Sequence, residues 1–113
     1  MSELRKIKCV GCEGGIPALT ADEIKHYMKD IIDWTVSEDH RHIMRNLSFK
    51  NFYHTMSFVN AVAFIANQEN HHPDLEIGYN YCHIKFTTHA VKGLTKNDFI
   101  CAAKIDALQL ETA

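Results

Sequence analysis

The sequence lacks the long apolar, basic and repetitive segments that set membrane, nucleic-acid-binding and repeat proteins apart. No apolar run is long enough to span a bilayer, and the first residues, MSELRKIKC, contain no apolar stretch of the kind found in signal peptides. Basic residues form no long block, and the formal net charge is −2, so the electrostatic features of a nucleic-acid binder are missing. We therefore expect a cytoplasmic protein that binds neither membranes nor nucleic acids.

Cysteine occupies only four positions, Cys9, Cys12, Cys82 and Cys101. Without a secretion signal, these residues are not expected to form a disulfide framework. Cys9 and Cys12 form a CxxC pair, but no second pair follows at the spacing of a closed zinc site. The βαβ context of a redox motif is missing as well. We interpret the pair as part of an ordinary N-terminal segment.

The 113 residues suit a single domain, and a hydrophobic content of 46% suffices for one core. Residues 1–19 are polar and then interrupted by glycine and proline, which predicts an irregular arm. Thr20 and Glu23 have the spacing of a capping box and predict a first helix over about residues 21–32. Thr95 and Asp98 form a second acidic cap signal, which predicts a last helix behind it.

The longest helix is predicted over residues 51–69, where apolar residues form two neighbouring stripes. So wide an apolar arc indicates burial on more than one side. We expect one side to cover a sheet and the other to meet another helix or another subunit. The first stripe contains Phe52, Met56, Val59, Ala63 and Ala66, and the second contains Phe58, Val62 and Ile65.

Four short segments alternate apolar and polar residues, which predicts four strands in two hairpins. Arg45 has the parity of its apolar neighbours, so it either extends to solvent near an edge or faces a partner or ligand. The element order is helix, strand, strand, helix, strand, strand, helix. We therefore predict an α+β domain with a four-stranded antiparallel sheet and helices packed on one face. The alternating residues are Trp34 and Val36, then Ile43, Leu47 and Phe49, then Leu75, Ile77 and Tyr79, and finally Cys82, Ile84 and Phe86.

Histidine is abundant, with eight residues, and three of them are candidates for chemistry. His71 and His72 stand at the predicted end of the long helix, and His89 follows the fourth strand. Pro73 disfavours helical backbone at His72, so the chain turns there and both rings can face one cleft. The remaining histidines fall at polar, turn or outward strand positions, where we expect solvent: His26, His40, His42, His54 and His83.

Three chemical interpretations of this histidine cluster are open. Imidazole titrates near neutral pH, so two rings in opposite protonation states form a metal-free acid–base pair, which the elimination of water requires. Three imidazoles can instead hold zinc with one open position. Metal-binding pairs on a helix usually stand three or four residues apart, and the adjacency of His71 and His72 argues mildly against this alternative. A purely structural role is the third interpretation.

The spacing of the cluster resembles that of the pterin-4a-carbinolamine dehydratases, also called 4a-hydroxytetrahydrobiopterin dehydratases. Five residues separate Pro73 from Tyr79, nine separate Tyr79 from His89, and eight separate His89 from Asp98. The similarity extends over nearly the whole chain from about Leu19 onward. Further matching residues are His71, His72, Thr88, Gly93, Leu94, Thr95, Asn97, Trp34 and the Arg45-x-Leu47-x-Phe49 strand.

The resemblance implies conversion of a 4a-hydroxytetrahydropterin to quinonoid dihydropterin and water, with no metal or other cofactor. This step recycles the pterin cofactor of aromatic amino acid hydroxylases such as phenylalanine hydroxylase. By the same resemblance, His71 and His89 transfer protons, in an order left open, and His72 mainly binds and orients the pterin. The other candidates for binding the substrate are Asn67, Asn70, Trp34 and Asp98.

Asn67 departs from the family pattern, which often has an acidic residue four positions before the first histidine of the pair. An amide donates and accepts hydrogen bonds but takes up no proton, which argues against a proton relay at this position. The departure keeps open a second hypothesis, a non-catalytic module that binds or dimerises another protein on the same fold. Family members form dimers or tetramers, so a homodimer or homotetramer is expected in either case.

Overall fold

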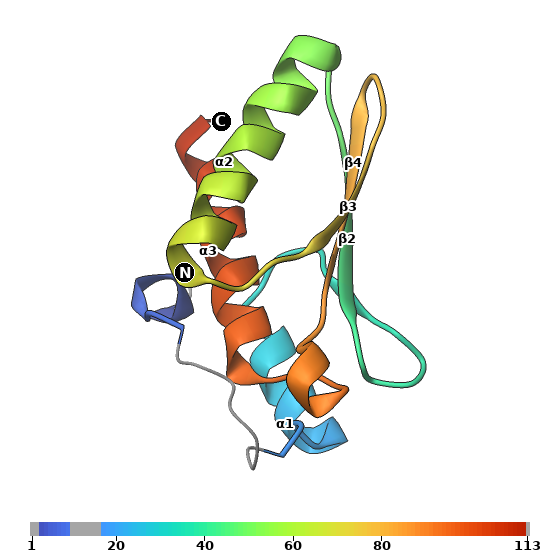
Figure 1. The fold of residues 1–113 in the computed structure, drawn as a ribbon, viewed down its shortest axis with the longest axis vertical. Coiled ribbons are helices and arrows are strands. Elements are labelled where there is room, and N and C mark those ends of the chain that lie inside the picture. Colours follow the sequence, from blue (N-terminus) through green and yellow to red (C-terminus); the bar gives the residue numbers. More distant parts are fainter. Residues whose placement is uncertain (1–2, 10–16, 113) are drawn as a thin grey trace.

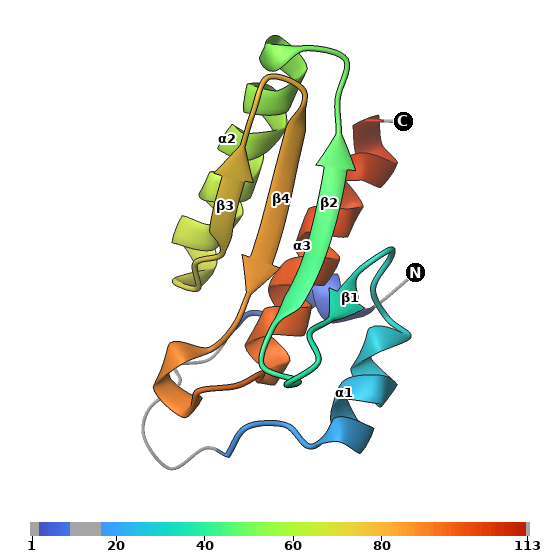
Figure 2. The ribbon, with the colours of Figure 1, turned by 90° about the vertical axis from the view of Figure 1, so that its right-hand side faces the viewer.

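The computed structural model describes residues 3–9 and 17–112, which form an antiparallel sheet and three α-helices. The sheet has the strand order β1-β2-β4-β3, and the helices lie on one side of it (Figure 1). Figure 2 shows β2, β4 and β3 side by side in front of α2 and α3. The predicted α+β class and element order are confirmed. The elements are η1 (Glu3–Lys6), α1 (Ala21–Met28), β1 (Thr35–Val36), β2 (Ile43–Ser48), α2 (Phe52–Glu69), β3 (Asp74–Ile77), β4 (Tyr81–Phe86), η2 (His89–Val91) and α3 (Lys96–Thr112).

The predicted capping box starts α1. The Glu23 N–H donates to Thr20 Oγ1 at 3.2 Å, and the Thr20 N–H donates to Glu23 Oε1 at 2.9 Å. The helix ends at Met28, so the predicted end at residue 32 was wrong. Asp33 has a φ of 61°, and the Ile32 N–H donates to a carboxylate of α3 instead of a helical carbonyl. Tertiary contacts therefore shorten a helix that apolar spacing alone would extend.

Arg45 points into the core from β2 and binds Asp106 of α3, with only 8% of the residue exposed. The side chain does not extend to solvent at an edge, and the partner that this cation faces is a carboxylate of the same chain. Trp34 also donates its indole N–H to Asp106, at 2.8 Å. Arg45 lies on the inward side of its strand because this carboxylate, distant in the sequence, pairs with it inside the core.

Asn51 caps α2 by accepting the His54 N–H on its side-chain oxygen at 2.9 Å. The face of α2 that contains Val59 and Val62 is buried, whereas Phe52 and Phe64 are 50% and 67% exposed. The wide apolar arc is therefore only partly covered within this chain. Neither α2 nor any other helix in the described part of the chain is long and apolar enough to cross a membrane.

The prediction of an irregular arm over residues 1–19 is wrong for one short segment. Glu3–Lys6 form the single 3-10 turn η1, which packs against α3 and buries Leu4 to 6% exposure. A lone apolar residue among charged neighbours gave too weak a signal for this contact. Cys12 and residues 14–16 lie outside the described residues.

Candidate active site

The end of α2 sets the position of His71. Asn70 adopts the left-handed conformation, with φ 53° and ψ 42°, and the His71 N–H donates to the Ala66 carbonyl at 3.1 Å. These two features stop the helix and turn the chain back under it. The His71 ring then lies parallel to the ring of Phe86, with centroids 5.8 Å apart and an interplanar angle of 3°. Its side chain is 11% exposed.

Asp98 holds the ring of His71 from the interior. Nε2 of His71 lies 2.6 Å from Oδ1 of Asp98, whose side chain is fully buried. The other carboxylate oxygen accepts the Thr88 hydroxyl at 2.7 Å and the Thr95 N–H at 2.9 Å. The hydroxyls of Thr88 and Thr95 lie 2.8 Å apart. Asp98 therefore stabilises the first turn of α3 and orients His71 at the same time.

This hydrogen bond assigns the two ring nitrogens different tasks. A carboxylate accepts hydrogen bonds, so the hydrogen of this contact belongs to Nε2 of His71, and Nδ1 is the ring nitrogen left for a ligand. Asp98 itself is 0% exposed, so it cannot make the contact with substrate that the sequence predicts. It acts as a positioning residue for His71.

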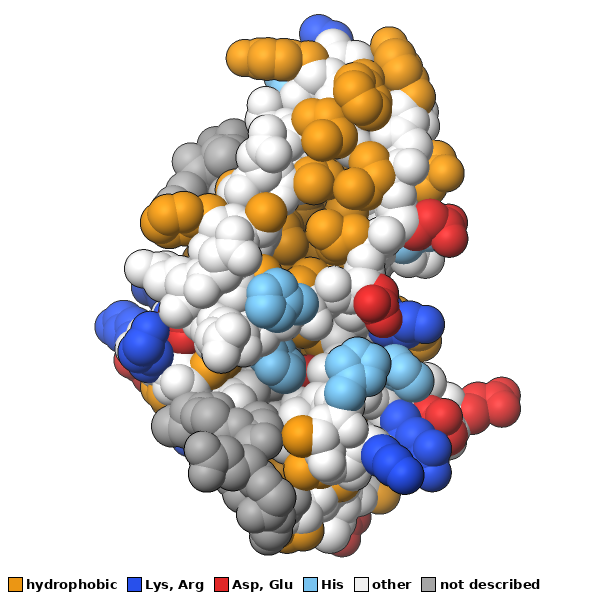
Figure 3. All heavy atoms as spheres, viewed as in Figure 1, with side chains coloured by type: hydrophobic (Ala, Val, Ile, Leu, Met, Phe, Trp, Pro, Cys, Tyr) orange, Lys and Arg blue, Asp and Glu red, His pale blue; other side chains and the backbone are white. Residues whose placement is uncertain are grey.

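The same carboxylate connects the two histidine-bearing segments. One oxygen of Asp98 contacts His71, which precedes His72, and the other contacts Thr88, which precedes His89. His72 and His89 are both exposed. Figure 3 shows histidine side chains gathered on one face of the molecule, beside an area of hydrophobic side chains. The two segments that carry the three predicted catalytic histidines thus meet around the buried carboxylate of Asp98.

The remaining predicted binding residues divide into two groups. Asn67 and Asn70 are exposed at the end of α2, next to His71 in the chain. Trp34 is buried to 5% exposure, packs 6.0 Å from the ring of Phe86, and is fixed by its bond to Asp106. Trp34 is therefore a core residue that supports Phe86, and not part of an open wall.

Three residues of the site, Phe86, Thr88 and Thr95, were not singled out for it from the sequence. Phe86 was expected only as a core residue, and its inward strand parity gave no sign that a histidine stacks on it. Thr95 was expected as a helix cap, and its cap partner Asp98 is the residue that binds His71. The cap signal could have identified this link, because a capping carboxylate has a second oxygen to offer.

The geometry of the described residues gives the three-histidine metal site no support. Among the side chains that the structure describes, in residues 3–9 and 17–108, no three of His, Cys, Asp or Glu are grouped so that they could hold a metal ion. The Nε2 atom of His71 is directed at Asp98.

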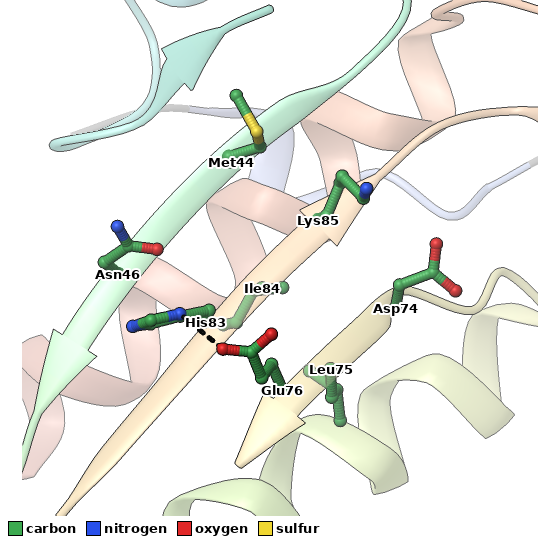
Figure 4. A pocket seen from close by; sticks show the side chains of 8 residues that line it. All are labelled: Met44, Asn46, Asp74, Leu75, Glu76, His83, Ile84 and Lys85. Carbon is green, nitrogen blue, oxygen red and sulfur yellow. Dashed lines mark ion pairs between the residues drawn. The ribbon is translucent and has the colours of Figure 1, made fainter. Parts of the chain in front are cut away.

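A separate hollow of about 350 Å³ lies on the face of the sheet opposite the helices (Figure 4). His83 points outward from β4 there, as its strand parity predicted, and its Nδ1 lies 3.4 Å from Oε1 of Glu76. None of the residues that form the hollow was predicted to be catalytic, and we assign it no role. Its lining consists of Met44, Asn46, Asp74, Leu75, Glu76, His83, Ile84 and Lys85.

Comparisons with known proteins agree on one family. The sequence model of the family described as pterin 4 alpha carbinolamine dehydratase matches residues 17–108. A Legionella pneumophila protein, provisionally named a pterin-4-alpha-carbinolamine dehydratase, is 59% identical over 111 residues, which cover 97% of this chain and 98% of that protein. A Nitrosomonas eutropha protein with the same provisional name is 51% identical over 106 residues, with coverage of 94% and 93%.

Solved structures agree on the fold. The crystal structure of a transcriptional coactivator/pterin dehydratase from Brucella melitensis matches with a TM-score of 0.77 and 27% identity, over 80% of this chain and 97% of that one. A pterin dehydratase-like protein, identified as a RuBisCO assembly factor in the alpha-carboxysome, matches with a TM-score of 0.59 and 20% identity. That match covers 68% of this chain and 89% of the other.

Proposed function

The chain belongs to the pterin 4 alpha carbinolamine dehydratase family, and we propose that it removes water from a 4a-hydroxytetrahydropterin. The observation that carries the proposal is the 2.6 Å contact between His71 and the buried Asp98. A fully buried carboxylate with three donors fixes the orientation of one imidazole, whose other nitrogen can exchange a proton. Such preorganisation is what an acid–base site requires.

The reaction requires one proton to be delivered and one to be taken away. The hydroxyl on C4a receives a proton and leaves as water, while the C4a–O bond breaks. The adjacent ring nitrogen supplies the electron pair for a new double bond to C4a and gives up its own proton. The product is quinonoid dihydropterin. Because the substrate provides this electron pair, two positioned imidazoles suffice.

In this proposal His71 and His89 exchange these two protons, and His72 binds and orients the pterin. The order of acid and base between His71 and His89 stays open. Asn67 and Asn70 would contribute hydrogen bonds to the substrate from the end of α2. Recycling of the pterin used by aromatic amino acid hydroxylases, in the cytoplasm, is the expected physiological role.

An exposed apolar surface supports self-association as part of the proposal. Tyr53 and Phe64 of α2 are 75% and 67% exposed, and they stand about three helical turns apart on the same face. Ile77 and Tyr79, at the end of β3 and beyond it, are also exposed. Figure 3 shows hydrophobic side chains gathered over the upper half of this view. A second copy of the chain is the occupant we propose for this α2 surface, formed by Phe52, Tyr53 and Phe64.

The same α2 surface favours the second candidate function, a module that acts by binding another protein. The Brucella relative, 27% identical, is described as both a coactivator and a pterin dehydratase. In this alternative the histidine cluster would be retained without turnover. Asn67, in place of an acidic residue, is the feature of this chain that agrees with it.

The test is turnover of freshly generated 4a-hydroxytetrahydropterin, with formation of the quinonoid product followed by absorbance. We expect a rate well above spontaneous dehydration, and a loss of about 10²–10⁴-fold for each positioned imidazole removed in His71→Ala and His89→Ala. His83→Ala is the matched control, because His83 lies in the separate hollow on the sheet and should leave the rate unchanged. A rate for the intact protein equal to the spontaneous background would reject the enzymatic proposal.

A further inference from the structure

Two cysteine thiols from distant parts of the chain lie in contact. Sγ of Cys9, in the N-terminal arm, is 3.6 Å from Sγ of Cys101 on α3, and 92 positions separate the two residues. Cys101 is fully buried and Cys9 is partly buried. The sequence pairs Cys9 with Cys12 only as a CxxC of an ordinary N-terminal segment, and Cys12 lies outside the described residues. The geometry of the described residues points to Cys101 instead.

Several contacts hold Cys9 in this position. Its N–H donates to Oε1 of Glu69 at 2.8 Å, and its thiol donates to the carbonyl of Asn97 at 3.7 Å. Upstream in the arm, Leu4 is buried, and Nζ of Lys104 donates to the Arg5 carbonyl at 2.9 Å. The arm is thus attached to the end of α2 and to α3, and the Cys9 sulfur meets Cys101 as a consequence of these attachments.

The surroundings of the Cys101 thiol oppose its ionisation. Since the hydrogen of Cys9 is directed at Asn97, the thiol of Cys101 is the donor in the contact between the two sulfurs. This hydrogen bond with Cys9, followed by burial, raises the pKa of the Cys101 thiol well above its ordinary value. Cys101 therefore keeps its hydrogen, and Cys9 is the sulfur open to an external reagent.

We propose that Cys9 and Cys101 are a redox modification site, at which a low-molecular-mass disulfide such as glutathione disulfide converts the two thiols to a reversible intramolecular disulfide. The Cys9 thiolate attacks the reagent, forms a mixed disulfide and releases one thiol. Cys101 then attacks the Cys9 sulfur, and its proton passes to the departing thiolate, which leaves as the second thiol. Two protein thiols are oxidised and the reagent is reduced to two thiols, so electrons and protons balance.

The disulfide would join the arm covalently to segments that carry the histidine cluster. Asn97, which accepts from Cys9, directly precedes Asp98, and Glu69 lies two positions before His71. A bond that closes so long a loop removes conformational entropy mainly from the unfolded chain. The oxidised protein is therefore expected to unfold at a higher temperature, by roughly 5–15 °C.

The test exposes the purified full-length protein to glutathione disulfide and maps disulfides by mass spectrometry of peptides produced without reduction. We expect a peptide that links Cys9 to Cys101, a raised unfolding temperature, and reversal of both by dithiothreitol. Cys9→Ser should abolish both effects. The matched controls Cys12→Ser and Cys82→Ala should retain them.

Three results would overturn the proposal. The first is a disulfide between Cys9 and Cys12 in place of the expected pair. The second is a stable mixed disulfide of Cys9 with glutathione, with Cys101 still a free thiol. The third is a Cys9–Cys101 disulfide that leaves the unfolding temperature unchanged. Because Cys9 is only partly buried, its serine variant should fold, and circular dichroism before oxidation checks this.

Discussion

Arg45 on β2 and Asp106 on α3 form an ion pair inside the core, with 9% and 5% of their side chains exposed. Asp106 also accepts the indole N–H of Trp34 and the backbone N–H of Ile32, both at 2.8 Å. One carboxylate therefore attaches α3 to the central part of the sheet and to the segment between α1 and β1. Removal of such a carboxylate takes this ion-pair partner away from a buried cation and leaves the Trp34 and Ile32 donors unsatisfied.

We predict that Asp106→Ala lowers the free energy of unfolding by about 3–5 kcal/mol, the usual cost of breaking a buried pair from one side. Arg45→Met should cost less, because the carboxylate keeps the donors of Trp34 and Ile32. Urea denaturation followed by circular dichroism measures both variants. A larger loss in Arg45→Met than in Asp106→Ala would contradict this order.

Asp98→Asn tests the positioning of His71. We expect kcat for pterin dehydration to fall about 10–100-fold with little change in KM, because the ring loses its orientation and not its contact with substrate. Steady-state kinetics with the freshly made carbinolamine measure kcat and KM separately. Asp74→Asn, which changes a carboxylate in the hollow on the sheet, is the control and should match the unaltered protein. An equal fall in both variants would refute the specific role.

The Glu69 carboxylate is expected to make the stability of the folded protein depend on pH in the acid range. Burial acts to raise its pKa, but the Cys9 N–H and the charges of Lys104 and Lys8 outweigh burial, so the pKa lies below its ordinary value of 4.5. A carboxylate with a lowered folded-state pKa stabilises the protein above the unfolded value and loses that contribution as pH falls through the folded value. The stability difference between the unaltered protein and Glu69→Gln should therefore be present at pH 7 and shrink below about pH 4.5.

Urea midpoints of the two proteins, measured between pH 7 and pH 3, follow this difference. Glu76→Gln serves as the comparison, since Glu76 has an exposed side chain and pairs only with His83 at 3.4 Å among the contacts described. A gap between the unaltered protein and Glu69→Gln that widens as pH falls would show the opposite sign of linkage.

Phe64→Glu tests the α2 surface as a contact between copies. A charge at this exposed position should leave the monomer folded and reduce the mass of the assembly, because a carboxylate cannot be buried there without a partner. Sedimentation velocity measures the mass, and Lys25→Glu on α1 provides a control for the added charge. An assembly of unchanged mass in Phe64→Glu would place the interface elsewhere.

Most of the fold could be predicted from local patterns, because its strands and caps are encoded within a few residues. The Thr20–Glu23 capping box and the buried parity of Cys82, Ile84 and Phe86 are examples. The misjudged features all depend on distant partners. Arg45 is buried because Asp106 lies opposite it, and α1 ends early because the Ile32 N–H binds the same carboxylate.

The candidate site also combines a local feature that the sequence predicts with distant contacts that it does not predict. A turn at His72 could be predicted, since Pro73 restricts the residue before it. The stacking of His71 on Phe86 could not, because an inward strand residue looks the same whether a core side chain or a histidine lies over it. The link from Asp98 to His71 also joins residues 27 positions apart, and only the folded chain brings them together.

Asp98 has one further consequence, since a single carboxylate begins a helix and orients a candidate catalytic ring. The two tasks belong to the two oxygens of one side chain. A replacement that removes both oxygens should free His71 and fray the start of α3 together, and fraying of α3 should misalign the ring. Catalytic competence should therefore vanish together with the local melting of one helical turn, well before the sheet itself comes apart.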